Sequence, residues 1–247
     1  MQATRPGSTE RRGGALPEVS PRAAREPSPD ANTVVMLRPL GSPTSLGLFG
    51  LAAATFTLAG LQLGWIPASQ GSAVGLVLIG FAAPAQLLAS VLAFLARDAV
   101  VGTAMGVLSL TWLSSGLVMV TGDPGQRSGA LGLLLLTSAV AVELTGLTAT
   151  LARLAAGAVL ITAAVRIGVT GLFQLSGQPW LETTAGVLGV LLAVLAVLVA
   201  WASELEDAGR PFPVPTGRRG KGRVAVEGSL PDQVRDVANE PGVRARL

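Results

Sequence analysis

The 247-residue chain is 50% hydrophobic and only 13% charged, whereas soluble domains carry about 25% charged residues, so its composition excludes an ordinary soluble fold. Cysteine, histidine and tyrosine are absent, which excludes disulfides, thiol nucleophiles, Ser-His-Asp catalysis and the usual zinc or haem ligands. We therefore expect neither a cofactor nor an enzyme. The net charge of +3 arises from arginine-rich tails, which suit anionic lipid headgroups, so we expect a lipid bilayer and no nucleic acid as a partner.

The chain begins with a tail and continues into a long apolar run. Residues 1–40 are rich in proline, arginine, glycine and serine and have no apolar period, which predicts disorder. Between Ser45 and Ala202, 158 residues carry only eight charged side chains. A helix of about 20 apolar residues spans the roughly 30 Å of membrane hydrocarbon. The run therefore predicts six spans, at about 45–66, 73–96, 99–121, 129–151, 153–175 and 182–203.

The predicted fold is all-α: a polytopic membrane protein with a six-helix transmembrane bundle over residues 41–204 and a disordered, charged C-terminal tail over 205–247. Connections between the spans are short, so consecutive helices are expected to pack as antiparallel hairpins. The fourth and fifth spans almost merge, and only Arg153 and the length limit predict a turn there. Residues 204–207 predict that the sixth span continues as an acidic helix.

Basic residues are distributed unevenly around these spans. With six spans both tails lie on one side of the membrane, and that side then carries sixteen lysines and arginines, against Arg127 alone on the other. Cytoplasmic loops are rich in such residues, so we predict that both termini are cytoplasmic in a multi-pass protein of the plasma membrane. The basic run at 218–223 either touches anionic lipid or belongs to a solvated tail.

Small residues within the spans predict close helix packing. Gly102 and Gly106 are four residues apart on the third span, and Gly186 and Gly189 lie on the sixth. Such residues let two helix backbones approach closely in a membrane. The partner helix belongs either to a second copy of the chain or to the same bundle, and both alternatives remain open.

A few polar residues predict an interior face. Leu51, Thr55 and Gln62 lie on one face of the first span, and a buried glutamine needs hydrogen-bond partners, so this face is predicted to point inward. On the second span Pro84 removes a backbone donor close to Gln86. A broken helix of this kind lines a cavity in some membrane proteins, although a simple proline kink is commoner.

Glu143 and Arg166 are the only charged residues deep within the predicted spans. Around a turn at Arg153 their depths differ by about 4–5 Å, which is within reach of an arginine side chain. One interpretation is a neutralising structural pair, because an isolated charge at this depth is costly. The other interpretation places Arg166 in an anion pathway and makes Glu143 a proton carrier.

Five short motifs, in order across residues 42–215, resemble those of the acetate uptake transporters, also called succinate–acetate permeases or the YaaH type. The first follows the family pattern Asn-Pro-Ala-Pro-Leu-Gly-Leu and keeps Pro43, Leu46, Gly47 and Leu48. The other four lie at residues 62–64, 82–90, 101–114 and 206–210. The family has asparagine, proline and an acidic residue at three positions where this chain has Ser42, Ser45 and Ala93.

The resemblance implies an integral membrane transporter or channel for acetate or related small carboxylates. It implies either proton-coupled symport of a monocarboxylate or channel-like anion conduction, and a homo-oligomeric ring, commonly of six subunits. By motif alignment the pathway narrows at Leu51 and Phe81, where family members have phenylalanine and tyrosine. Together with the polar positions above, the predicted pathway comprises Leu51, Thr55, Gln62, Phe81, Gln86 and Arg166.

The alternative is a non-transporting membrane scaffold or sensor that retains the family fold, and the missing polar motif residues favour it. A membrane-embedded enzyme is not expected, because the sequence shows no nucleophile–base pair or metal-ligand cluster. Flux of a labelled carboxylate distinguishes a transporter from a scaffold.

Overall fold

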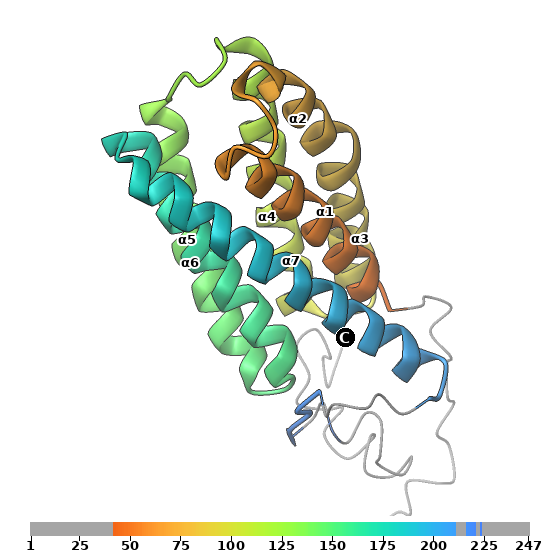
Figure 1. The fold of residues 1–247 in the computed structure, drawn as a ribbon. Helices are drawn as coiled ribbons and strands as arrows, with labels where there is room; N and C mark the ends of the chain where they lie inside the picture. The colour runs from red at the N-terminus through yellow and green to blue at the C-terminus, as the bar shows by residue number, and fades with distance from the viewer. Residues whose placement is uncertain (1–41, 211–215, 221–222, 224–247) are drawn as a thin grey trace, which may run out of the picture. The chain divides into compact units, whose positions relative to one another are not determined.

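The computed structural model of the protein describes residues 42–210, 216–220 and 223, so the predicted tail over 1–40 lies outside the described residues. Six helical segments are long and apolar enough to cross a membrane (Figure 1). Five are single helices, and the second segment consists of four consecutive pieces. Their bounds are α1 (Thr44–Gln62), η2 (Ala68–Gln70), α2 (Gly71–Val77), η3 (Leu78–Ala82), α3 (Ala83–Leu95), α4 (Ala99–Thr121), α5 (Gly129–Thr150), α6 (Leu154–Ser176) and α7 (Pro179–Asp207).

These helices confirm the predicted all-α bundle with six long apolar segments. Their boundaries differ from the predicted spans by at most five residues, because length and apolarity alone determine where a span fits. Many large apolar side chains are exposed on the outer faces of the helices, as expected where lipid replaces water as the solvent. Examples are Leu133, Val140, Leu191 and Val194.

Helix α1 lies in the interior of the bundle. This helix packs along α7 and also contacts α2, α3 and α4, whereas α5 packs mainly along α6 (Figure 1). Leu51 and Thr55 on α1 are completely buried, so the predicted inward face of this helix is confirmed. A path along the middle of the bundle therefore follows α1.

The small residues of α4 and α7 pack within the same bundle. A Cβ atom on Gly106 would lie 3.0 Å from Ser90 Oγ of α3, and that hydroxyl donates a hydrogen bond to the carbonyl of Gly102 at 2.7 Å. Gly186 and Gly189 of α7 face α1 in the same close manner. Of the two alternatives left open by the sequence, packing within one bundle accounts for these four glycines.

The second span is interrupted close to Pro84, as the sequence predicts. The π-helical segment η3 ends at Ala82, two residues before the proline. Proline has no backbone N–H and clashes with a regular helical turn before it, and a π turn relieves this by inserting one extra residue. Ser109 of α4 donates a hydrogen bond to the carbonyl of Ala83 at 2.8 Å, which ties the altered turn to its neighbour.

Residues 216–219 of the C-terminal tail contact the end of α7 and the turn between α5 and α6. Glu206 near the end of α7 forms an ion pair with Arg218 and accepts a hydrogen bond from the Thr216 hydroxyl at 2.7 Å. The backbone N–H of Leu154 then donates to the carbonyl of Gly217 at 3.2 Å. Residues 216–219 are thereby held against the turn between α5 and α6, through main-chain bonds that composition does not reveal.

Glu206→Gln is expected to loosen this C-terminal contact, since it removes the charge that pairs with Arg218. A hydrogen-bonded ion pair of this kind contributes on the order of 1 kcal/mol, so the amide of Leu154 should exchange about fivefold faster with deuterated solvent. Glu204→Gln, at an exposed position of the same helix, is the matched control. Equal exchange in the two variants would show that the ion pair does not hold the segment.

Candidate functional site

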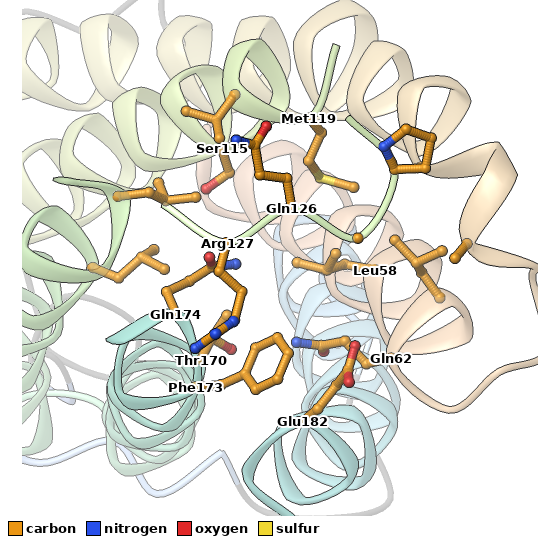
Figure 2. A pocket seen from close by; sticks show the side chains of 18 of the residues that line it. Leu58, Gln62, Ser115, Met119, Gln126, Arg127, Thr170, Phe173, Gln174 and Glu182 are labelled. Atoms are coloured by element: carbon orange, nitrogen blue, oxygen red, sulfur yellow. The ribbon is translucent and has the colours of Figure 1, made fainter. Parts of the chain in front are cut away.

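A cavity of about 320 Å³ opens at the end of the bundle where α1 ends and α7 begins (Figure 2). We call it the Gln62 cavity. Its lining comes from α1, η2, α2, α4, α5, α6, α7 and the loop between α4 and α5. The labelled lining residues are Leu58, Gln62, Ser115, Met119, Gln126, Arg127, Thr170, Phe173, Gln174 and Glu182.

The Gln62 cavity combines a charged mouth with an uncharged floor. Asp123, Arg127 and Glu182 line it beside apolar side chains such as Phe173. Two hydroxyl groups of the lining donate to carbonyls of their own helices, Ser115 to Thr111 at 2.8 Å and Thr170 to Arg166 at 3.0 Å. The hydroxyl protons are therefore engaged within the helices.

Arg166 lies one helical turn beyond this cavity and is only 1% exposed. Its Nη2 donates a hydrogen bond to Gln62 Oε1 on α1 at 3.2 Å, and its Cζ lies 5.7 Å from the centroid of the Trp112 ring on α4. A Cβ atom at Gly189 of α7 would lie 2.8 Å from Arg166 Nε. The guanidinium is thus held between α1, α4 and α7 by a hydrogen bond, an aromatic face and a glycine that leaves room for it.

Of the two interpretations of Glu143 and Arg166, the structural ion pair is not formed in the described residues. Within the described residues no ion pair joins the two side chains, and Glu143 is half-buried on α5. Their similar depth does not bring them together, because Arg166 points into the bundle interior and reaches Gln62 and Trp112 on other helices. The positive charge of Arg166 is therefore not neutralised by Glu143.

A second cavity, of about 100 Å³, lies at the opposite end of α1. We call it the Thr44 cavity. Leu48, Met105 and Leu160 contribute apolar walls, and Arg153 and Asp98 contribute charges, with 3.9 Å between Arg153 Nη2 and Asp98 Oδ2. A smaller space of about 20 Å³ adjoins it, bounded by Thr44, Arg153, Ala155, Ala156, Val199, Ser203, Glu206, Thr216 and Arg218.

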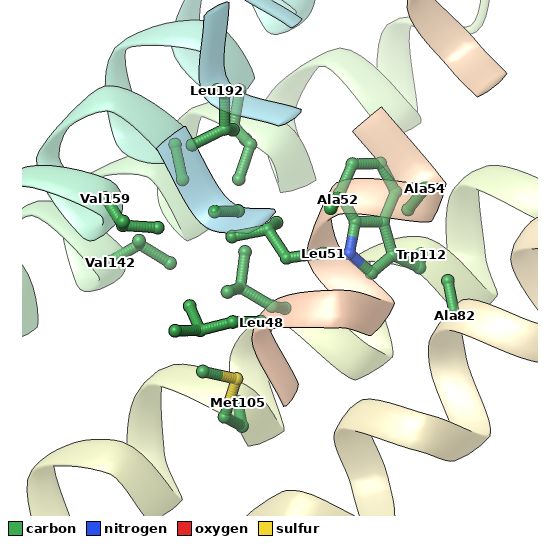
Figure 3. Packing of buried hydrophobic residues seen from close by; sticks show 14 of the residues in the cluster. Leu48, Leu51, Ala52, Ala54, Ala82, Met105, Trp112, Val142, Val159 and Leu192 are labelled. Carbon is green, nitrogen blue, oxygen red and sulfur yellow. The ribbon is translucent and has the colours of Figure 1, made fainter. Parts of the chain in front are cut away.

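A closed apolar layer separates the two cavities. Leu48 lines the Thr44 cavity and Leu58 lines the Gln62 cavity, and ten residues of helix correspond to about 15 Å. Between them Leu51 is completely buried in a cluster of large apolar side chains (Figure 3). The main members of this layer are Leu48, Leu51, Met105, Leu108, Trp112, Val142, Val159 and Leu192.

Phe81 does not join the predicted pathway residues. Its side chain is 55% exposed, whereas Leu78, Ala82 and Gln86 of the same span are completely buried. These three residues are four apart and form the stripe that packs against the bundle, and Phe81 lies beside that stripe on the outer surface. The motif alignment that named Phe81 as a constriction residue therefore does not agree with its exposed position.

Gln86 is buried between the helices and lines neither cavity. Its Nε2 donates a hydrogen bond to the carbonyl of Gly47 at 3.2 Å and lies 3.8 Å from Met105 Sδ. Gly47 belongs to the first motif, and a Cβ atom there would lie 2.6 Å from the same sulfur atom. Pro43 precedes α1, and Leu46 is 40% exposed on its outer side. The motif thus brings α1 close to α3 and α4.

The prediction from sequence did not include Trp112 and Gly189 as neighbours of Arg166. Trp112 lies within the third motif, but a tryptophan in a span is usually read as packing. The need of a buried Gln62 for a partner was recognisable, and Arg166 supplies it. What the chain order does not show is that a residue of α6 reaches across to α1.

Gly189→Ala is expected to displace the Arg166 guanidinium and to destabilise the protein by about 1–3 kcal/mol, as overpacking does. Gly186→Ala is the control, since a Cβ atom there would meet Leu63 rather than Arg166. The measurement is Trp112 fluorescence, with the three exposed tryptophans replaced by phenylalanine, namely Trp65, Trp180 and Trp201. Only Gly189→Ala should shift the emission of Trp112. Equal spectra for Gly189→Ala and Gly186→Ala would contradict the contact between Gly189 and Arg166.

Among sequence models of known protein families, the model of the GPR1/FUN34/yaaH family matches residues 25–218 of the chain. Among solved structures, one described as the bacterial acetate channel SatP is similar, with a TM-score of 0.63 and 21% sequence identity, over 72% of this chain and 99% of that one. At this identity the likeness shows a common fold. No curated protein matches the chain.

Proposed function

The chain belongs to the GPR1/FUN34/yaaH family, and we propose that it conducts acetate or related small carboxylates across a membrane through the interior of its bundle. The observation that carries this proposal is the pair of cavities at the two ends of α1, with a closed apolar layer between them. A conduit for a small solute needs access from both sides and a barrier that opens, and this arrangement supplies both.

The proposed pathway runs from the Gln62 cavity past Gln62, Arg166 and Thr55 to Leu51, and then into the Thr44 cavity. Leu51 and its apolar neighbours form the barrier, because a buried hydrophobic constriction excludes water and ions. On this proposal the packing of the layer rearranges for passage, and the arrangement with Leu51 buried is the closed state of the pathway.

Arg166 supplies the attraction for an anion. It is a permanent positive charge next to the floor of the Gln62 cavity, and no acidic side chain in the described part of the chain forms an ion pair with it. At the mouth the positive charge of Arg127 is accompanied by the carboxylates of Asp123 and Glu182. The attraction for an anion is therefore assigned to Arg166, whose charge acts in low-dielectric surroundings.

Glu143 is proposed as the proton carrier if flux is coupled to protons. Its carboxyl lies on α5, half-buried and without an ion pair among the described residues. A carboxyl within a membrane helix raises the free energy of insertion, and carboxyls that occur there usually have a function. If Glu143 carries the proton, the rate of acetate uptake should depend on pH, whereas the affinity for the anion should not.

The orientation follows from the charge asymmetry of the sequence. With both termini in the cytoplasm of a plasma-membrane protein, the Thr44 cavity faces the cytoplasm and the Gln62 cavity faces outward. We also propose a homo-oligomer, as the resemblance to the family implies. Each protomer then contains its own pathway, because both cavities are built from one chain.

Uptake of radiolabelled acetate by proteoliposomes tests this function. Purified protein should give uptake well above empty liposomes, and an inward proton gradient should accelerate it if symport applies. Well-folded protein that gives no uptake at any pH would contradict the proposal. A stoichiometric protein partner without flux would instead support the scaffold or sensor alternative.

A further inference from the structure

We infer that Arg166 and Trp112 together form a binding site for the ionised form of a small monocarboxylate, at the boundary between the Gln62 cavity and the closed layer. This inference rests on the proposed function, because the ligand is the transported acid. It begins from two buried N–H groups, Arg166 Nε and Trp112 Nε1, for which the described part of the chain provides no acceptor. Such orphaned donors are costly to bury and are rare in native proteins.

Other polar groups around the layer are already engaged. The hydroxyl of Thr55 donates to the carbonyl of Leu51 at 2.8 Å, and those of Ser115 and Thr170 also donate to their own helices. The third orphaned atom of the described interior, Gln86 Oε1, is an acceptor rather than a donor. The uncommitted hydrogen-bonding capacity near Arg166 is therefore of the type that binds an anion.

Arg166 and Trp112 lie close to each other and to the cavity. The guanidinium carbon of Arg166 lies 5.7 Å from the centroid of the Trp112 ring, and Figure 3 shows the nitrogen edge of that ring turned toward Leu51. Each residue is one helical turn from a residue that lines the Gln62 cavity, Thr170 for Arg166 and Ser115 for Trp112. An anion that enters this cavity reaches both donors by moving one turn deeper.

The surroundings select the class of anion. A carboxylate has two oxygens and accepts one hydrogen bond from a guanidinium and another from an indole N–H. Beyond the donors lie Leu51 and Leu192, which suit a methyl or ethyl group. A second carboxylate placed against these side chains would be desolvated without a partner. The site therefore favours acetate or propionate over a dicarboxylate such as succinate.

Ligand binding is measured on the full-length protein in detergent. Trp112 is made the only tryptophan by changing the exposed Trp65, Trp180 and Trp201 to phenylalanine. Sodium acetate should change the emission of Trp112 in a saturable manner, compared with sodium chloride at equal ionic strength. Succinate should require at least about tenfold higher concentration. If acetate, chloride and succinate change the emission of Trp112 equally, the inference is overturned.

Two variants in the wild-type background test the donors, with thermal stabilisation by acetate as the readout. Trp112→Phe keeps an aromatic ring beneath Arg166 and removes the N–H, and Arg166→Gln removes the charge. Both should bind acetate at least about tenfold more weakly. Arg127→Gln, at the cavity mouth, should bind within about twofold of wild type. Unchanged affinity of Trp112→Phe and Arg166→Gln overturns the site.

A merely structural role for Trp112 predicts a different result. Because Trp112→Phe removes ring volume as well as the N–H from a buried position, it should lower the melting temperature without acetate, and under the inference it should also lose the stabilisation by acetate. A melting temperature several degrees lower, with acetate affinity retained, contradicts the inference. Transport is judged separately: binding without uptake rejects the proposed function and keeps the site, whereas uptake that survives in both variants rejects the site and keeps the function.

Discussion

Arg166→Gln is expected to reduce acetate uptake in proteoliposomes about 10- to 100-fold, whereas Glu143→Gln should retain uptake and lose its dependence on pH. The guanidinium is 1% exposed and is the one cation beside the pathway between the cavities in the described part of the chain. A charge-assisted hydrogen bond to a carboxylate contributes about 1.5–3 kcal/mol, and each 1.4 kcal/mol corresponds to a factor of about ten.

The control for this comparison is Arg127→Gln, which removes a positive charge from the mouth of the Gln62 cavity and leaves the interior unchanged. It should lower uptake by a small factor that disappears at high salt, because an exposed charge is screened. Gel filtration and melting temperature establish that each variant is folded. Arg166→Gln protein that is folded and transports at the wild-type rate would remove Arg166 from the pathway.

Leu51→Ala is expected to increase acetate flux about tenfold while lowering stability by about 2–5 kcal/mol, the usual cost of truncating a buried leucine. Leu51 is completely buried between the two cavities, so its truncation opens space in the closed layer. The measurements are the initial rate of uptake and the denaturation midpoint of the same preparation. Leu46→Ala, on the outer side of the same helix, should change neither by a comparable amount.

A different outcome for Leu51→Ala would assign the barrier to other residues of the layer. If stability falls and flux does not rise, then the neighbouring side chains close the pathway without Leu51. In that case the next residue to truncate is Leu108, which is equally buried and belongs to the same layer. Flux that increases for Leu46→Ala as well would indicate general loosening of the bundle rather than an opened barrier.

The spans were predictable because they depend on chain length and apolarity, which are local properties. The inward face of α1 was also predictable, because Leu51, Thr55 and Gln62 share one side of a regular helix. Phe81 lies in the π-helical segment η3, where its side chain is exposed. A π turn changes the local pitch of the helix, and a motif alignment contains no information on that change.

The failure at Glu143 has a different cause. The sequence indicates how deep each residue of the α5–α6 hairpin lies, but it does not indicate how α6 is rotated about its own axis. That rotation is determined by packing against α1, α4 and α7, and it directs Arg166 toward Gln62 and Trp112. For the same reason the contact with Gly189, far along the chain, was not predictable.

The absence of cysteine from the whole sequence permits one direct test of the central claim, that the acid passes through the interior of the bundle. A single cysteine at Thr170, on the floor of the Gln62 cavity, is modified with a small charged thiol reagent, and Ser176→Cys, exposed at the same end of α6, is the control. Modification at position 170 should abolish acetate uptake, and acetate should slow that modification, while the control continues to transport. Uptake that continues after complete modification at position 170 would contradict an interior pathway.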